Sequence, residues 1–63
     1  MTDKELKQHG YYVHYNHPGN RNIRASVFIH GHRFATMTSR SRPELRKWVR
    51  EQMLVDFVTR KLG

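Results

Sequence analysis

From Ile23 to Ile29, every second residue has an apolar side chain. The apolar set is Ile23, Ala25, Val27 and Ile29. A period of two is typical of a β-strand with one buried face, because successive side chains of a strand point to opposite sides. The pattern therefore predicts a half-buried strand at the centre of the chain.

Two further strands are predicted beside this one. Tyr11–Asn16 is dense in aromatic and β-branched residues, which favour strands. His17–Asn22 contains Pro-Gly and two asparagines, which are typical of a loop. His30-Gly31 suits a tight hairpin turn, because glycine tolerates positive φ, and His32–Thr38 is predicted to return as the third strand.

The length of the turn at His30-Gly31 decides which side chains share a face of the sheet. With a two-residue turn, Val27 faces Phe34 on the inner side, and Ala25 faces Thr36 there as well. The outer side then carries Arg24, Phe28, Arg33 and Met37. A turn of three residues changes this register, and the pattern is compatible with both lengths.

Helix signals occur at both ends of the chain. Ser41–Glu44 fits a capping box with proline in the first turn, which predicts a helix from there to about Leu62. Its apolar stripe, suited to packing on the sheet, consists of Leu45, Trp48, Val49 and Met53. Thr2–Glu5 fits a second capping box. A short helical turn over Asp3–Gln8 and a frayed arm are equal alternatives there.

These elements predict an α+β fold: a three-stranded antiparallel sheet with the C-terminal α-helix packed on one face. Residues 1–10 form the N-terminal arm or short helix, and residues 11–63 form a single β-β-β-α domain. No apolar run approaches the ~20 residues that cross a membrane. The first ten residues lack the apolar core of a signal peptide. We therefore expect a soluble, cytoplasmic protein without a membrane partner.

The apolar stripe of the C-terminal helix breaks after Met53. On a regular helix, Leu54, Phe57 and Val58 point away from the sheet, and Asp56 takes a place on the inner face. One interpretation is a protein interface, either with a host protein or with a second copy in a homodimer. The alternative is an irregular or kinked helix that buries these residues locally.

Charge is distributed unevenly along the chain. Between Leu6 and Pro43 there is no aspartate or glutamate, yet this stretch holds six Lys/Arg residues and all five histidines. The chain carries a net charge of +7, and its arginines outnumber its lysines eight to four. A long stretch of one sign favours a polyanionic partner. Guanidinium groups match phosphate oxygens and guanine edges. Both features indicate a basic nucleic-acid-binding domain.

The candidate nucleic-acid-binding residues form two sets and one isolated member. The sheet-face set is Arg24, Phe28 and Arg33. The strand-to-helix set is Arg40, Arg42, Arg46 and Lys47, beside helix N-terminal amides that favour phosphate. Arg21 lies in the loop between the first two strands.

Catalysis and metal binding find little support in the sequence. The five acidic residues lie only in the two flanking segments, and isolated Ser and His residues do not define a nucleophilic site. His14-x-x-His17 and His30-x-His32 have spacings that suit imidazole ligands, but structural zinc normally recruits thiolates, and the chain has no cysteine. We expect no enzymatic activity, no cofactor and no metal site.

From Ile23 to Arg46 the chain resembles the second half of a double-stranded RNA-binding domain. Alternating apolar residues, the turn at Gly31 and a returning strand lead into the basic helix start Arg40-Ser41-Arg42-Pro43-Glu44-Leu45-Arg46. The resemblance implies that Arg42 and Arg46 hold phosphates across the major groove. Pro43 stands where that family usually has lysine, and the first helix of the family is longer than the one expected here.

The same β-β-β-α order also looks like the small domains that place three strands in the DNA major groove, such as integrase arm-binding and AP2-type domains. That resemblance implies base contacts from Arg24, Phe28 and Arg33. The hypothesis is thus a non-enzymatic domain that binds duplex DNA or RNA, by one of two surfaces. The rival hypothesis is a small protein-binding regulator, for example a phage-type inhibitor of a host enzyme.

Overall fold

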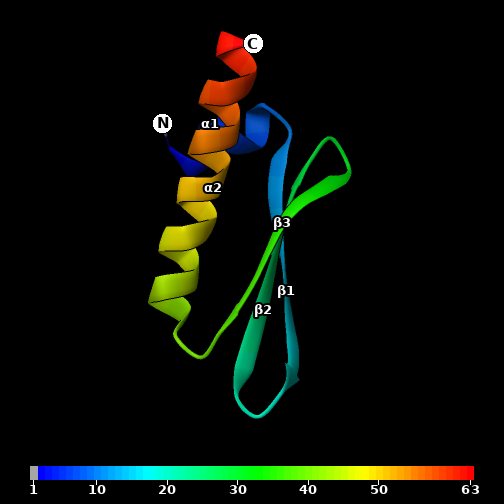
Figure 1. Cartoon of the computed structure of the whole chain (residues 1–63), viewed down its shortest axis with the longest axis vertical. Helices are drawn as coiled ribbons and strands as arrows, with labels where there is room; N and C mark the ends of the chain where they lie inside the picture. The colour runs from blue at the N-terminus through cyan, green and yellow to red at the C-terminus, as the bar shows by residue number, and fades with distance from the viewer. Residues whose placement is uncertain (1) are drawn as a thin grey trace.

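Three antiparallel strands and two helices make up the structure, a computed structural model that describes residues 2–63 (Figure 1). The elements are α1 (Asp3–Gln8), β1 (Tyr11–Gly19), β2 (Asn22–Ile29), β3 (His32–Ser39) and α2 (Arg42–Leu62). The sheet order is β1-β2-β3, and α2 runs along one face of the sheet. The predicted α+β fold is confirmed, including the short N-terminal helix. None of the helices within residues 2–63 is long and apolar enough to span a membrane.

The core lies between the inner face of β2 and the facing side of α2. All four alternating apolar residues of β2 are buried, because β2 is the central strand and one of its faces is covered by the helix. The helix contributes Leu45, Val49 and Met53, and α1 adds Leu6. Trp48 packs against this cluster while partly exposed. The sequence prediction for this stripe is confirmed.

A bulge in β3 changes the predicted register. The turn has two residues, because Ile29 pairs with His32, and Phe28 pairs with Arg33. Val27 then pairs with Ala35, so that Phe34 is the extra residue of a β-bulge. From that point on, each residue of β3 lies on the opposite face from the one predicted.

The bulge has two consequences for the sheet faces. Met37, predicted on the outer side, pairs with Ala25 and packs against the core, whereas Thr36 pairs with Ser26 on the outer side. Phe34 packs on the inner side, as predicted, and its ring meets the ring of Tyr11 edge-on at 6.1 Å between centroids. The bulge therefore keeps Phe34 in the core and moves Ala35 and Met37 to the core side as well.

The strand β1 is longer than predicted and ends in a tighter turn. It continues through His17 and Pro18 to Gly19, which pairs with Asn22. Asn20 and Arg21 form the two-residue connection, both with positive φ (51° and 61°). Asparagine adopts this conformation readily, but arginine rarely does. The residue types therefore do not indicate a two-residue turn at this place, and the loop predicted over His17–Asn22 is longer than the observed turn.

The C-terminal half of α2 is covered by α1 and by the start of β1. The ring of Phe57 contacts the ring of His9 in a tilted arrangement, at 4.9 Å between centroids, and Leu54 also packs against the core. The expectation that Leu54, Phe57 and Val58 all point away from the core is wrong for the first two, because α1 supplies a cover that the sequence pattern does not reveal. Val58 is exposed. As a protein interface, this set stays a prediction.

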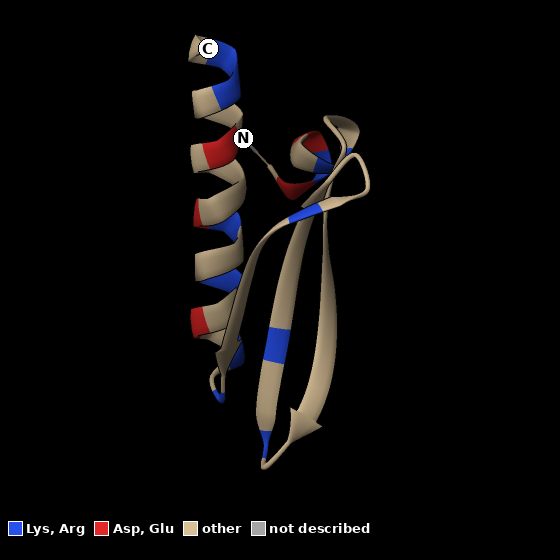
Figure 2. Ribbon diagram, turned by 45° about the vertical axis from the view of Figure 1, so that its right-hand side comes forward, with Lys and Arg blue, Asp and Glu red and all other residues tan. Residues whose placement is uncertain are grey.

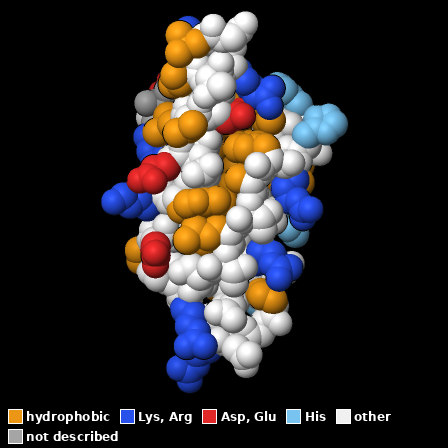
Figure 3. All heavy atoms as spheres, in the orientation of Figure 1, with side chains coloured by type: hydrophobic (Ala, Val, Ile, Leu, Met, Phe, Trp, Pro, Cys, Tyr) orange, Lys and Arg blue, Asp and Glu red, His pale blue; other side chains and the backbone are white. Residues whose placement is uncertain are grey.

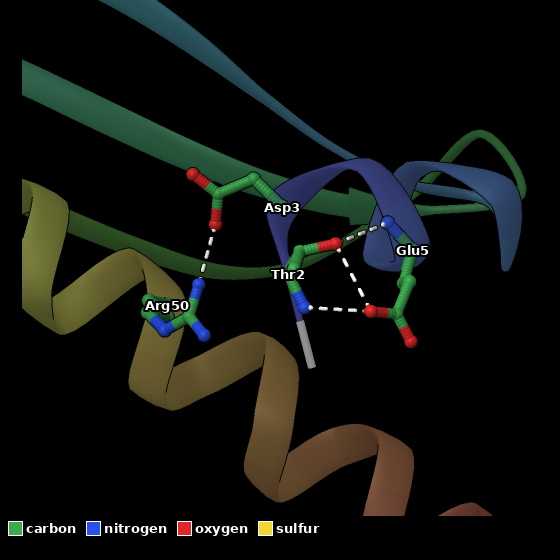
Figure 4. Close-up of polar contacts among 4 residues, drawn as sticks. All are labelled: Thr2, Asp3, Glu5 and Arg50. Carbon is green, nitrogen blue, oxygen red and sulfur yellow. Dashed lines mark hydrogen bonds and ion pairs between the residues drawn. The ribbon is translucent and has the colours of Figure 1, made fainter.

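The helix α1 is held by its own cap and by an ion pair (Figure 4). The Thr2 hydroxyl accepts a hydrogen bond from the Glu5 amide, and the Glu5 carboxylate accepts one from the Thr2 amide. Arg50 of α2 donates to the carboxylate of Asp3 at 2.7 Å. The capping box and this ion pair together fix a helix that is too short to be stable alone.

Gly10 joins α1 to β1 at a position that only glycine fits. Its φ is +95°, and a Cβ at this position would lie 2.5 Å from the ring of His30. We expect Gly10→Ala to lower the free energy of unfolding by about 2 kcal/mol, measured by urea denaturation. Gly31→Ala is the matched control, because φ there is +83° with open space around the Cβ. Equal losses for the two variants would show that the contact with His30 contributes nothing.

Tyr11 links β1 to α2, and its ionisation makes the free energy of unfolding fall at alkaline pH. Its hydroxyl donates to Asp56 at 2.7 Å, and burial, followed by the hydrogen bond and charge of Asp56, raises the pKa of Tyr11 from 10.0 to about 12. The unfolded chain therefore ionises Tyr11 at lower pH than the folded chain does. This contribution is fully present below pH 10 and is lost as pH rises to 12.

We expect a loss of about 2 kcal/mol across this window, measured as unfolding free energy against pH. In Tyr11→Phe, this part of the alkaline loss of unfolding free energy should be absent. Tyr12→Phe, which alters a hydroxyl on the opposite face of β1, retains it. An identical alkaline profile for wild type and Tyr11→Phe would contradict the assignment.

Candidate nucleic-acid interface

The outer face of the sheet is not covered by either helix, because α2 packs over β2 and β3 from the inner side and α1 meets only the start of β1. The register of the three strands decides which side chains this face presents. They are Tyr12, His14 and Asn16 of β1, Arg24, Ser26 and Phe28 of β2, and Arg33, Thr36 and Thr38 of β3. We call this set the outer sheet face.

Two aromatic rings form the apolar part of the outer sheet face. Tyr12 and Phe28 are direct cross-strand partners, and their rings stack at 4.8 Å between centroids with an angle of 2° between their planes. Such pairs contribute about 1 kcal/mol beyond the area that they bury. Tyr12 remains 43% exposed. The pair therefore forms a fixed apolar feature on a face that is otherwise polar.

Arg24 and Arg33 lie on the same face as this aromatic pair, Arg33 beside it across the sheet and Arg24 further along β2. Arg33 is the direct partner of Phe28, and Arg24 lies four residues before Phe28 on β2. Four residues of a strand span ~13 Å. Both side chains are exposed, and neither forms an ion pair within residues 2–63. The structure thus brings the three predicted members of the sheet-face set together.

The acidic side chains are all on the helices. In Figure 2 the red segments lie on α1 and α2, and the sheet carries only blue. Asp3 pairs with Arg50 and Asp56 pairs with Arg60, while Glu5 bonds to Thr2 within its own cap. The potential of the outer sheet face is therefore positive, because no carboxylate lies on any of the three strands.

Three of the four residues of the strand-to-helix set lie beside one groove between α2 and β1. Arg42 and Arg46 line a small cavity together with Tyr15 of β1. Arg46 and Lys47 also line the larger cavity next to it, and Arg40 is exposed in the connection before α2. The set is therefore separate from the outer sheet face, and Arg40 is the member that lines neither cavity.

The N-terminus of α2 already holds a hydrogen-bond acceptor and an acid. The Ser41 hydroxyl accepts from the amide of Glu44 at 3.4 Å, and the carboxylate of Glu44 accepts from the Ser39 hydroxyl. A carboxylate in the first turn reduces the attraction of the helix end for a phosphate. The helix start is thus a weaker anion site than its basic sequence predicts.

Arg21 occupies the tip of the β1–β2 hairpin. It is exposed, and its φ of 61° is uncommon for a residue with a side chain. It places a cation beyond the end of the sheet, next to the strand that carries Arg24. Asn20-Gly would be the more stable choice for this turn, so the hairpin carries an arginine at some cost in backbone energy.

The histidines of the structure serve packing roles or lie exposed. His30 places its ring over Gly10, and His9 contacts the ring of Phe57. Across residues 2–63, no three side chains of the His, Asp and Glu type gather closely enough to hold a metal ion. The structure thus offers no ready-made ligand set in the part of the chain that it describes.

Tyr12 belongs to the candidate site but was not among the predicted residues. Its place depends on the pairing of β1 with β2, which is set by the two-residue turn at Asn20-Arg21. The only sequence signal was the alternation within Tyr11–Asn16, which puts Tyr12 and His14 on one face. That pattern does not show which face meets α2.

Comparisons of the chain with protein-family models, with curated proteins and with solved structures found no match. The resemblances to double-stranded RNA-binding domains and to three-stranded DNA-binding domains therefore stay predictions.

Proposed function

We propose that this protein is a non-enzymatic domain that binds duplex DNA through the outer sheet face. One observation carries the proposal. Arg24 and Arg33 form no ion pair within residues 2–63, and they share with the Tyr12–Phe28 stack a sheet face without any acid. A cytoplasmic location, with access to nucleic acid, is part of the proposal.

The dimensions of the outer sheet face suit the major groove of B-form DNA. That groove is about 12 Å wide and admits β-strands. The ~13 Å along β2 between Arg24 and Phe28, with Arg33 beside the latter, brings the two guanidinium groups near opposite groove walls. The major groove of A-form RNA is too deep and narrow for this approach. The shape therefore favours DNA over duplex RNA.

The aromatic pair favours a duplex over a single strand. Single-strand binders stack unpaired bases on open aromatic faces. Here one face of each ring is covered by the other ring, at 4.8 Å between centroids. A fixed apolar pair of this kind suits contact with thymine methyl groups on the groove floor. The hydroxyl groups of Ser26, Thr36 and Thr38 on the same face can donate to phosphates or base edges.

The excess of cations supplies the affinity in this proposal. Only Arg50 and Arg60 form ion pairs within residues 2–63, so most of the +7 net charge is available to phosphates. Binding of this kind weakens steeply with salt, because each neutralised phosphate releases counterions.

The direct test removes the arginines of the outer sheet face. Arg24→Ala/Arg33→Ala is expected to weaken binding to a random-sequence DNA duplex at least about tenfold at low salt, measured by fluorescence anisotropy. The slope of affinity against salt should also fall by about 1.8, because two phosphate contacts are lost. Neither side chain contributes to the core, so the thermal unfolding curve should change little.

The matched control is Arg42→Ala/Arg46→Ala, which removes the same charge from the helix start. Its DNA affinity should stay within about threefold of wild type, because only long-range electrostatic attraction is lost. Loss of binding in this control variant but not in the sheet variant would favour the helix-start mode implied by the double-stranded RNA-binding resemblance. Absence of binding to any duplex at low salt would overturn the proposal.

A further inference from the structure

A groove runs between α2 and the inner side of β1, on the face of the sheet opposite to the proposed DNA surface. The helix packs over β2 and β3 and leaves β1 largely uncovered. The resulting cavity of about 590 Å³ has Val13 and Tyr15 of β1 on one wall, and Val49 and Met53 of α2 on the other. A second cavity of about 170 Å³ shares Tyr15 and continues toward the start of α2.

The edge of β1 beside this groove is free and lacks the usual protection. Edge strands expose alternate backbone N–H and C=O groups, and proteins normally block them with charged side chains, proline or bulges. The strand β1 has no charged residue, and both its proline, Pro18, and the irregularity in its pairing with β2 between Asn16 and Gly19 lie near the far end. The opposite edge, β3, carries both Arg33 and the bulge at Phe34. Residues 11–16 therefore present an open template for another strand.

The groove has a cationic rim. Lys7, Arg46 and Lys47 line the larger cavity and form no ion pair within residues 2–63. Arg42 adds a further cation at the smaller cavity, one helical turn before Arg46. Positions one turn apart on a helix are ~6 Å apart, close to the ~7 Å between alternate residues of a strand. The acid on this rim, Asp3, is engaged by Arg50 (Figure 4).

We infer that the β1 edge and this groove bind an extended peptide segment of a partner protein by strand addition, with apolar and acidic side chains alternating on the face that enters the groove. The added strand pairs with residues 11–16, its apolar side chains contact Val13 and Tyr15, and its carboxylates meet Arg46 and its neighbours. The inference does not depend on DNA binding, because Tyr12 at the β1 edge is the one residue that lines the larger cavity and also belongs to the outer sheet face.

Two other occupants fit the groove less well. A second copy that paired through β1 would bring two such cationic rims together, and each chain carries a net charge of +7. Like charges that face each other oppose the formation of an interface. A nucleic acid would match the rim, but the walls between the cations are apolar, which suits side chains better than a phosphate backbone.

The hydrophobic surface outside the groove offers no such argument. Figure 3 shows hydrophobic side chains along the seam between α2 and the sheet and on the upper part of α2. Val55, Val58 and Leu62 are exposed on α2. Nothing near them selects one kind of partner, whereas the groove combines an open edge, apolar walls and a rim with more cations than acids.

The test uses the full chain and a short capped peptide labelled with a fluorophore. When the peptide is extended, its threonines lie on one face, and its valines alternate with its glutamates on the other face. We expect saturable binding by fluorescence anisotropy, weakened about tenfold when lysine replaces the glutamates. Arg46→Glu should weaken binding by a similar factor. Arg33→Glu, the same charge change on the outer sheet face, should leave it within about twofold.

Backbone pairing is tested by two further peptides, N-methylated on alternate sets of residues. Only the set whose N–H groups point toward β1 should abolish binding, because the other set faces solvent. Equal binding of both methylated peptides, or no binding of the parent peptide, would overturn the inference. So would a dimer at micromolar concentration by sedimentation, since a second copy would then occupy the edge. Displacement of the peptide by a single-stranded oligonucleotide, in an Arg46-dependent manner, would assign the groove to nucleic acid instead.

Discussion

The contact between the inner face of β2 and one side of α2 is the interaction on which the rest of the structure depends. Val27, Ala25 and Leu45 are fully enclosed there, and the other elements attach around them. Within residues 2–63, α2 is the one long helix, and it covers one face of the sheet. The other face must be compatible with water or with a partner. Its composition therefore follows different rules from those of the core.

That division explains where the charges lie. The acids are placed on helices, where Asp3 and Asp56 tie α1 and the end of α2 into the fold. The sheet carries none of them, and its exposed arginines form no ion pair within residues 2–63. The stacked rings of Tyr12 and Phe28 lie on the same face as Arg24 and Arg33. We interpret the outer sheet face as a surface prepared for a polyanion, and the groove beside β1 as a separate surface for a peptide.

Much of the fold was predictable from local signals. The alternation in Ile23–Ile29 identified the central strand, and the capping box at Ser41 placed the start of α2. The sheet-face set Arg24, Phe28 and Arg33 follows from a two-residue turn at His30, one of the two turn lengths compatible with the pattern, and the structure has that turn.

Non-local packing accounts for what was missed. The bulge at Phe34 lets the Phe34 ring and the Met37 side chain both pack against the core, which offsets the loss of one regular ladder position. The cover over Phe57 requires α1 to dock, which no periodicity in α2 can reveal. The stack of Tyr12 on Phe28 depends on a turn in which Arg21 adopts an uncommon conformation. Each of these features is settled by contacts between distant segments.

The central claim is that the outer sheet face, and not the start of α2, meets the phosphates of duplex DNA. Side-chain Nε–Hε resonances of arginine, followed by NMR during titration with a short B-form duplex, test it most directly. The account predicts large shifts for Arg24 and Arg33 that saturate with added duplex, and small shifts for Arg42 and Arg46. Large shifts confined to Arg42 and Arg46 would contradict it.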